Sequence, residues 1–280
     1  MADRPEARDR KSIFVTGGAS GIGRATCRLF AERGWFIGAY DIDEAGLASL
    51  EQELGSENCL TRRLDVSDKA EFDRAMAEFS EATGGRLDLL FNNAGIGAGG
   101  WFEEVPYEVA MRVLEVNFLG VVNGVYAGIP LLKRTPNSFC FSTSSSAALV
   151  GMPRTGMYSA TKFAVKGLTE ALSAELARFG SRAADMMPAL IDTAILESAL
   201  DYSGAEPPGL TMKKNAAPEG PTRLVQPEEV AELVWEAYGS DRVHWYIPVE
   251  MEAVEKARAG GVEPLLNQFK KSVLESSEDG

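Results

Sequence analysis

The sequence predicts an α/β fold in which helices cover both faces of a doubly wound parallel sheet. Short apolar runs of four to seven residues alternate with longer stretches of helical periodicity. A glycine-rich turn, Thr16-Gly-Gly-Ala-Ser-Gly-Ile-Gly23, joins the first run to the first helical stretch. Each further motif falls just after a predicted strand or on the helix that follows one. This alternation indicates parallel strands joined by right-handed crossovers, with ligands bound at the carboxyl ends of the strands.

The predicted strands are the short apolar runs, because strands buried on both faces are continuously apolar. In chain order they are Ile13–Thr16, Trp35–Tyr40, Cys59–Leu64, Leu87–Phe91, Ser138–Ser142 and Ala183–Met187. The helices are predicted where apolar residues recur every three or four positions. They cover Ser20–Arg33, Glu44–Leu54, Lys69–Thr83, Tyr107–Leu132 and Met157–Phe179, and a further one begins near Pro227. Pro130 marks the point where the fourth helix bends or stops.

One Rossmann-like domain is expected over residues 12–250, because no linker divides the chain into two units. A polar extension (1–11) precedes this domain, and a C-terminal helix with a polar tail (251–280) follows it. The segment at about 194–226 differs in composition from the rest of the domain, because it begins apolar and then becomes rich in proline and glycine. An insertion of this kind inside a compact fold is usually a functional or a disordered loop. We expect it to form a lid over the ligand site.

Composition excludes several classes of function. The net charge of −13 disfavours sequence-independent binding to nucleic acid, which needs a basic surface. No run of 18 apolar residues occurs and the polar N-terminus lacks the apolar core of a secretory signal, so we expect no membrane partner and a cytoplasmic location. Cys27, Cys59 and Cys140 match neither a disulfide framework nor a zinc site, and no metal is expected. The single histidine, His244, is interpreted as a strand-end or packing residue.

The glycine-rich turn predicts a dinucleotide site. Glycines permit a tight turn, and the following helix N-terminus offers unpaired N–H groups and positive potential to a pyrophosphate. Asp41 ends the second predicted strand, where a carboxylate can accept hydrogen bonds from both ribose hydroxyls and would repel a 2′-phosphate. Ser20 and Ile42 are uncharged, so NAD is favoured over NADP. Alternatively, Asp41 caps the next helix, and the two roles are compatible.

The pentapeptide Tyr158-Ser-Ala-Thr-Lys162 predicts acid–base chemistry. Four residues are roughly one helical turn, so the phenol and the ammonium group project from one face. A nearby cation favours the phenolate and lowers a pKa that is normally about 10. This pair suits a general acid or base that acts on an alcohol or a carbonyl. The alternative is a partly buried tyrosine on an amphipathic helix.

Further motifs stand in order between the glycine turn and Tyr158. Asp65-Val66 follows the third strand, Asn92-Asn-Ala-Gly95 follows the fourth, and Asn117 lies in the long helix. Ser145 stands 13 residues before Tyr158, next to Ser142, Ser144 and Ser146. With these motifs the chain, from Ser12 to about Pro248, resembles the core branch of the short-chain dehydrogenase/reductase family, whose usual serine-to-tyrosine spacing favours Ser145 over its neighbours. The family usually has Pro-Gly after the sixth strand, whereas this chain has Pro188-Ala189, which affects the local loop or the width of the pocket.

The resemblance implies an NAD-dependent enzyme that transfers a hydride between the cofactor and a secondary alcohol or ketone. Tyr158 would be the acid–base group and Ser145 would bind the substrate oxygen. Lys162 would lower the pKa of Tyr158 and hold the nicotinamide ribose, and Asn117 would hold a water that links Lys162 to solvent. The implied cofactor-binding residues are Gly17, Ser20, Gly21, Ile22, Gly23, Asp41, Ile42, Asp65, Val66, Asn93, Ala94, Gly95, Tyr158, Lys162, Pro188, Ile191 and Thr193.

The expected substrate is a small molecule of medium or bulky apolar character, such as an alicyclic, aromatic or steroid-like alcohol or ketone. The expected substrate wall consists of Ile96, Trp101, Met152, Met157, Leu190, Ile195, Leu196 and Tyr202. The alternatives are a 3-oxoacyl thioester reductase, which commonly uses NADPH, and a non-catalytic dinucleotide-binding sensor on the same scaffold. By resemblance the chain is also expected to form a homodimer or homotetramer.

Overall fold

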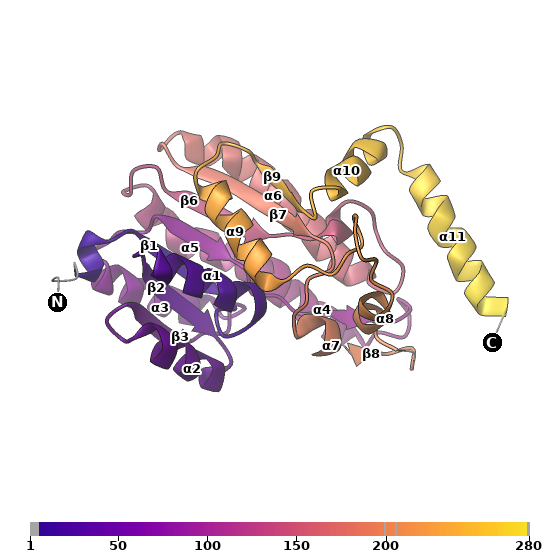
Figure 1. Cartoon of the computed structure of the whole chain (residues 1–280), viewed down its shortest axis with the longest axis horizontal. Helices are drawn as coiled ribbons and strands as arrows, with labels where there is room; N and C mark the ends of the chain where they lie inside the picture. The colour runs from indigo at the N-terminus through magenta and orange to yellow at the C-terminus, as the bar shows by residue number, and fades with distance from the viewer. Residues whose placement is uncertain (1–5, 199, 205, 279–280) are drawn as a thin grey trace.

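The six predicted strands and one further strand, β9, pair in one parallel sheet of seven strands, in the order β3-β2-β1-β4-β6-β7-β9. This arrangement confirms the α/β, doubly wound fold expected from the sequence (Figure 1). The structure is a computed structural model that describes residues 6–198, 200–204 and 206–278. Residues 1–5 of the polar extension, positions 199 and 205 of the expected lid and the last two residues of the tail lie outside the described residues.

The sequence located the main elements to within two residues at each end. The strands of the central sheet are β1 Ser12–Thr16, β2 Phe36–Asp41, β3 Cys59–Arg63, β4 Leu89–Asn92, β6 Phe139–Thr143, β7 Arg182–Pro188 and β9 His244–Ile247. The predicted helices correspond to α1 Gly21–Glu32, α2 Glu44–Leu54, α3 Lys69–Ala82, α6 Gly156–Ala177 and α9 Pro227–Tyr238, and to the long helical run 107–132.

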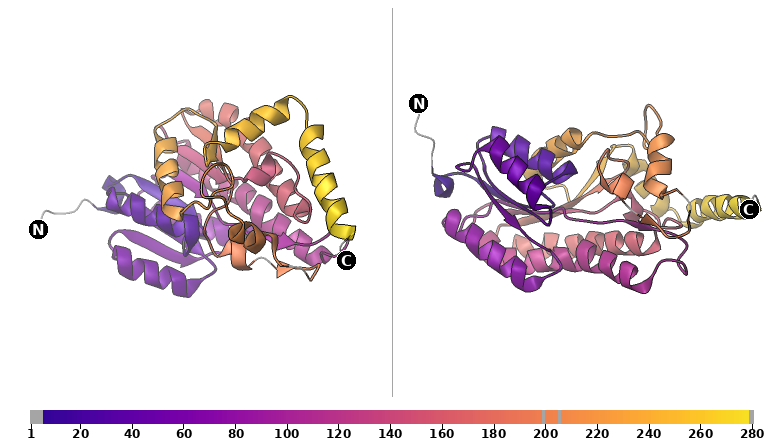
Figure 2. Two further views of the ribbon diagram at one scale, coloured as in Figure 1. Left: turned by 45° about the vertical axis from the view of Figure 1, so that its right-hand side comes forward. Right: turned by 90° about the horizontal axis from the view of Figure 1, so that it is seen from below.

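Helices cover both faces of the sheet, as the right-hand view of Figure 2 shows. On one face α1, α2 and α9 bury side chains such as Phe30, Leu50 and Val234. On the other face α3, α6 and the run 107–132 bury side chains that include Phe72 and Leu172. Because both faces are covered, β1, β4 and β6 are buried along their whole length. Continuous apolar runs in the sequence therefore mark these strands better than alternating ones would.

The chain reverses its direction of winding between β1 and β4. From β1 it proceeds to β2 and β3 on one side, and it returns to β4, β6, β7 and β9 on the other. β1 pairs with β2 and with β4, so the loops that leave β1 and β4 diverge to opposite faces of the sheet. In open α/β sheets such a switch point opens a crevice at the carboxyl ends of the strands, where ligands bind.

The stretch predicted as one helix, 107–132, is continuous but not uniform. It consists of α4 Tyr107–Leu114, a π-helical turn η2 Glu115–Leu119 and α5 Gly120–Leu132. Pro130 lies in the last turn, so the helix ends two residues after it. By length and composition alone this run is apolar enough to cross a membrane, and half of its most apolar window is buried inside the fold.

The sequence did not predict several shorter elements. Two of them, β5 Ala98–Gly99 and β8 Leu200–Asp201, pair in parallel as a separate two-stranded sheet. The expected lid contains α7 Ile195–Ser198 and α8 Pro208–Lys214. One C-terminal helix with a polar tail was expected, but the structure has two helices, α10 Met251–Ala259 and α11 Glu263–Glu278. Figure 1 shows α11 directed away from the sheet.

The single histidine belongs to a charged network rather than to apolar packing. His244 begins β9, and its Nδ1 lies 2.8 Å from Oδ1 of Asp185, whose side chain is completely buried. Its Nε2 lies 3.3 Å from a carboxylate oxygen of Glu170 on α6. Burial by itself would lower the pKa of His244, as would the charge of Lys166, but the hydrogen bond and charge of Asp185 outweigh both and raise it. Through Asp185 and Glu170, His244 therefore connects β9 with β7 and α6.

We predict that this network makes the stability of the protein depend on pH. Because the folded state raises the pKa of His244, its stabilisation is fully present below the ordinary value of 6.5 and is lost as pH rises through the folded pKa. The loss should be about 1 kcal/mol, the typical net contribution of one hydrogen bond. Urea unfolding between pH 5.5 and 8.5 should show this decrease in the wild type and not in His244→Gln. Equal pH dependence in both proteins would contradict the assignment.

Candidate active site

The turn between β1 and α1 has a backbone that only glycine fits. Gly17 has φ +70°, in the left-handed region. A Cβ on Gly23 would lie 2.0 Å from the carbonyl oxygen of Gly17, so the first turn of α1 packs directly on the turn. Ser20, the N-cap of α1, makes no side-chain capping hydrogen bond. The first N–H groups of this helix thus have no side-chain cap and can bind an anionic group.

Asp41 lies at the end of β2, across from the glycine turn. Its Oδ2 accepts a hydrogen bond from the backbone N of Ala19 at 3.0 Å, and its Oδ1 accepts one from Asp43 N at 3.1 Å. The N-cap of α2 is Asp43, whose side chain accepts from Gly46 N. The alternative interpretation of Asp41 as the helix cap is therefore wrong. The neighbouring Ile42 is 59% exposed.

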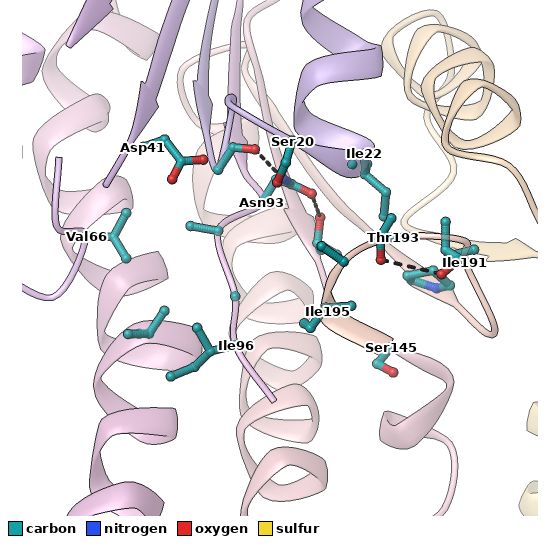
Figure 3. Close-up of a pocket in the computed structure, with 18 of the residues that line it drawn as sticks. Ser20, Ile22, Asp41, Val66, Asn93, Ile96, Ser145, Ile191, Thr193 and Ile195 are labelled. Atoms are coloured by element: carbon teal, nitrogen blue, oxygen red, sulfur yellow. Dashed lines mark hydrogen bonds between the residues drawn. The ribbon is translucent and has the colours of Figure 1, made fainter. Parts of the chain in front are cut away.

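One cavity of about 380 Å³ follows the carboxyl ends of the strands. In Figure 3, Asp41 and Ser145 lie toward opposite ends of it. Most of the expected cofactor-binding residues line it: Gly17, Ser20, Gly21, Ile22, Asp41, Ile42, Asp65, Val66, Asn93, Ala94, Gly95, Tyr158, Pro188, Ile191 and Thr193. Gly23 and Lys162 do not line it, because Gly23 packs on the turn itself and Lys162 is only 3% exposed. An uncapped helix N-terminus beside a strand-end carboxylate fits a dinucleotide.

Two side chains connect the glycine turn to the neighbouring strands. The hydroxyl of Thr16 accepts hydrogen bonds from the backbone N of Asn93 at 2.9 Å and of Ala94 at 3.0 Å. The Asn93 amide donates to the carbonyl of Thr16 at 3.1 Å and accepts from the hydroxyl of Thr143 at 3.1 Å. The ends of β1, β4 and β6 are therefore held at fixed separations.

Ser145 and Tyr158 meet at one end of the cavity. Ser145 starts a 3₁₀ turn, η3 Ser146–Ala148, and its hydroxyl accepts from Ala147 N at 3.1 Å. Burial raises the pKa of Tyr158, and a hydrogen bond with Ser145 opposes that increase. The neighbouring Ser144 instead donates to the carbonyl of Lys162 at 2.9 Å, which directs it toward α6. Of these two serines, Ser145 is the one that influences the pKa of Tyr158.

Lys162 lies behind Tyr158, as expected for residues one turn apart on α6. Its Nζ donates to the carbonyl of Thr143 at 2.9 Å and lies 5.5 Å from the centre of the Tyr158 ring. Burial lowers the pKa of Lys162 to about 8. The expected lowering of the Tyr158 pKa does not occur in this structure, because the burial of the phenol outweighs the influences that favour its charged form.

Asn117 fixes the segment that follows β4. It is fully buried in the π-helical turn η2. Its Oδ1 accepts from the backbone N of Ile96 at 2.8 Å, and its Nδ2 donates to the carbonyl of Ile96 at 2.9 Å. The side-chain amide is thus engaged with the backbone of Ile96. The expected role of Asn117 in holding a water stays a prediction.

The opposite end of the cavity contains a cation that the sequence did not reveal. Arg112 on α4 lines the cavity and donates to Oδ2 of Asp65 at 2.7 Å, while the Ser67 hydroxyl donates to Oδ1 at 2.6 Å. Burial tends to raise the pKa of Asp65, but the hydrogen bonds from Ser67 and Arg112 outweigh it and lower the pKa. Nothing in the spacing along α4 distinguishes Arg112 from an ordinary surface arginine.

Only some residues of the expected substrate wall line this cavity. Ile96, Ile195 and Leu196 line the main cavity, and Ala189 joins them. Leu190 does not, because it points away from the side on which its neighbours 189 and 191 face, and it is 2% exposed. Trp101, Met152 and Tyr202 also lie outside the lining of this cavity. Met157 lines a second cavity, since adjacent residues on a helix project about 100° apart and Tyr158 faces the first.

Ala189 is accommodated without backbone strain. Among the described residues, the only non-glycine positions with positive φ are Asn137 and Arg154. The backbone N of Ala189 donates to the carbonyl of Ile247 at 2.8 Å, so the chain continues the pairing of β7 with β9. The departure from the usual Pro-Gly therefore leaves the strand end regular and adds one methyl group to the cavity wall.

Metal-binding side chains do not cluster in the part of the chain that the structure describes. No group of three or more His, Cys, Asp and Glu residues there could hold a metal ion. Cys27, Cys59 and Cys140 are buried and free. Burial raises the pKa of each thiol, Cys59 to about 11 and Cys140 to about 12, so the thiolate form is disfavoured.

Comparison with known proteins agrees with this geometry. The family model described as short chain dehydrogenase matches residues 11–202. A "Probable oxidoreductase EphD" of Mycobacterium tuberculosis is 34% identical over 269 residues, which cover 93% of this chain and 44% of EphD. The chain therefore spans less than half the length of that relative.

Two further similarities cover most of both partners. L-2,3-butanediol dehydrogenase of Corynebacterium glutamicum is 33% identical over 232 residues, which cover 80% of this chain and 90% of that enzyme. The crystal structure of a short chain dehydrogenase/reductase from Burkholderia phymatum in complex with NAD is 29% identical, with a TM-score of 0.77. That similarity covers 93% of this chain and 97% of the other.

We predict that Gly23→Ala weakens dinucleotide binding. The added methyl would lie 2.0 Å from the carbonyl oxygen of Gly17, so the turn must move away from α1. Overpacking of this kind costs about 1–3 kcal/mol of stability, and we expect the Kd for NADH to rise at least tenfold. The matched control is Gly239→Ala, where the nearest atom is 3.6 Å away. Unchanged NADH fluorescence titrations in Gly23→Ala would show that the turn does not bind the dinucleotide.

Proposed function

The chain belongs to the short-chain dehydrogenase/reductase family, and from this premise we propose that it transfers a hydride between NAD(H) and a secondary alcohol or ketone. One observation carries the proposal. Ser145 and Tyr158 both line one end of a cavity that also contains Asp41 and the glycine turn. A proton-transferring group and a dinucleotide site therefore open into the same space. The similarity to L-2,3-butanediol dehydrogenase supports a substrate with a carbinol group.

The four catalytic residues have distinct proposed roles. When bound, the nicotinamide ring supplies the hydride donor or acceptor. Ser145 donates a hydrogen bond to the substrate oxygen and stabilises the negative charge that develops on it. Tyr158 exchanges a proton with that oxygen, and Lys162 places a cation behind the phenol. Asn117 keeps Ile96, a wall of the cavity, in position.

The buried phenol suits ketone reduction at neutral pH. Because burial raises the pKa of Tyr158, the group is protonated and can donate its proton to a carbonyl oxygen. Alcohol oxidation needs the phenolate, which the hydrogen bond from Ser145 favours. Both directions use the same pair of oxygens.

Asp41 supports NAD over NADP as the cofactor. Its carboxylate lines the cavity at the end of β2, where a 2′-phosphate would meet a negative charge. Arg24 on α1 could have offset that charge, but it donates to the Gly46 carbonyl at 3.1 Å and to Glu53 at 2.9 Å. The same arrangement argues against a thioester reductase that depends on NADPH. A dinucleotide sensor without activity would not need Ser145 and Tyr158 to line the same end of the cavity.

We predict that Tyr158→Phe binds NADH with unchanged affinity but loses activity at least 10³-fold, since removal of the acid–base group commonly costs 10²–10⁴. The measurements are NADH and NADPH fluorescence titrations and kcat for a panel of secondary alcohols and ketones. The wild type should bind NADH more tightly than NADPH. Near-wild-type turnover by Tyr158→Phe would contradict the assignment of the acid–base group. Wild-type binding of NADH without turnover of any alcohol or ketone would favour the sensor.

A further inference from the structure

A second, smaller cavity lies beside the first, and the proposed chemistry does not use it. Its volume is about 230 Å³, and it lies between the start of α4, the start of α6 and the segment that begins at β5. The side chains that line it are mainly apolar. They belong to Ala98, Phe102, Val105, Tyr107, Ala110, Val113, Arg154, Met157 and Tyr158, with Gly100 and Gly156 completing the wall.

The two cavities are neighbours along three shared elements. Tyr158 lines both of them. On the helical run 107–132, Val116 lines the first cavity and Val113, three residues earlier and on the same helix face, lines the second. On the segment after β4, Ile96 lines the first and Ala98 lines the second. The wall around the phenol therefore continues from the first space into the second.

Arg154 connects the lid segment to the wall of the second cavity. The guanidinium of Arg154 lies 2.5 Å from Asp201, whose side chain is completely buried, and 3.2 Å from the Ser203 hydroxyl. The carbonyl of Arg154 accepts from Gly100 N at 2.9 Å, and Tyr202 N donates to the Gly99 carbonyl at 2.8 Å. The pairing of β5 with β8 and this ion pair hold the lid against the wall of the cavity.

The chemistry of the second cavity selects against charged ligands. Its one cation is already neutralised by Asp201. The Nε of Arg154 is buried, so this N–H is not exposed to a ligand in the cavity. The remaining wall is aliphatic and aromatic. Such a site binds an apolar group that carries at most an ether, hydroxyl or carbonyl oxygen.

We propose that this second cavity, together with Tyr158, binds the apolar end of the substrate, and that this end is an aromatic or alicyclic ring on a short spacer from the carbinol carbon. A cavity of about 150 Å³ holds a benzene molecule, so about 230 Å³ holds one substituted ring. A steroid nucleus is too large for this space. The proposal rests on the proposed function and assigns the substrate class of the same site.

The experiment compares 2-butanol with 4-phenyl-2-butanol, which share a carbinol group and differ in the ring. The wild type should show a kcat/KM for the phenyl substrate at least tenfold higher, because ring burial contributes to binding. Ala110→Phe and Ala98→Leu add bulk to the cavity from two different elements. Each should remove most of this preference, with a smaller effect on 2-butanol. The matched control, Ala110→Ser, keeps the cavity volume and should keep the preference.

A binding measurement separates this proposal from the proposed function. The probe is 4-phenyl-2-butanone with the NAD-bound enzyme, a complex that cannot turn over. Loss of its binding in both filling variants, with NAD affinity unchanged, supports the cavity assignment even if no alcohol is oxidised. Equal kcat/KM values for the two alcohols in the wild type would overturn the proposal. So would ketone binding in the filling variants that equals that of the wild type and of Ala110→Ser.

Discussion

The site depends on the hydrogen bonds that hold the ends of β1, β4 and β6 together. The Thr16 hydroxyl accepts hydrogen bonds from the backbone N–H groups of Asn93 and Ala94. The Asn93 side chain donates to the Thr16 carbonyl and accepts from the Thr143 hydroxyl. These bonds place the glycine turn beside the strand that leads to Ser145. The Thr143 carbonyl also accepts a hydrogen bond from the Lys162 ammonium group, so the same cluster positions α6 and its Tyr158. The same hydrogen bonds therefore position both the proposed cofactor site and the proposed acid–base pair.

Much of this arrangement can be predicted from the local sequence. The glycine turn needs a left-handed backbone at Gly17 and no side chain at Gly23, and both requirements appear directly as residue identity. Helical periodicity places Tyr158 and Lys162 on one face of α6. The strands of the central sheet are buried on both faces, so that continuous apolar runs reveal them. Asp41 was identified as a strand-end carboxylate in the same way, because it directly follows one of these apolar runs.

Other features depend on contacts that local sequence does not encode. The strands β5 and β8 are two residues each, and they pair across about a hundred positions of the chain, as Arg154 and Asp201 do across 47. The π-helical turn around Asn117 has the same apolar periodicity as the helix on either side. Leu190 was expected in the substrate wall, but it does not line the main cavity, because the direction of a single side chain depends on the exact local backbone. The role of Arg112 could not be predicted, because its contact with Asp65 depends on how α4 packs against the rest of the fold.

The most direct test is a crystal structure of the protein with NAD and a non-reactive ketone. The account predicts that the ketone oxygen lies within about 2.6–3.2 Å of both the Tyr158 phenol and the Ser145 hydroxyl, beside the nicotinamide ring. It also predicts that the adenosine ribose is bound by Asp41. A ketone oxygen out of reach of both hydroxyls, in a crystal where NAD occupies the cavity, would contradict the account.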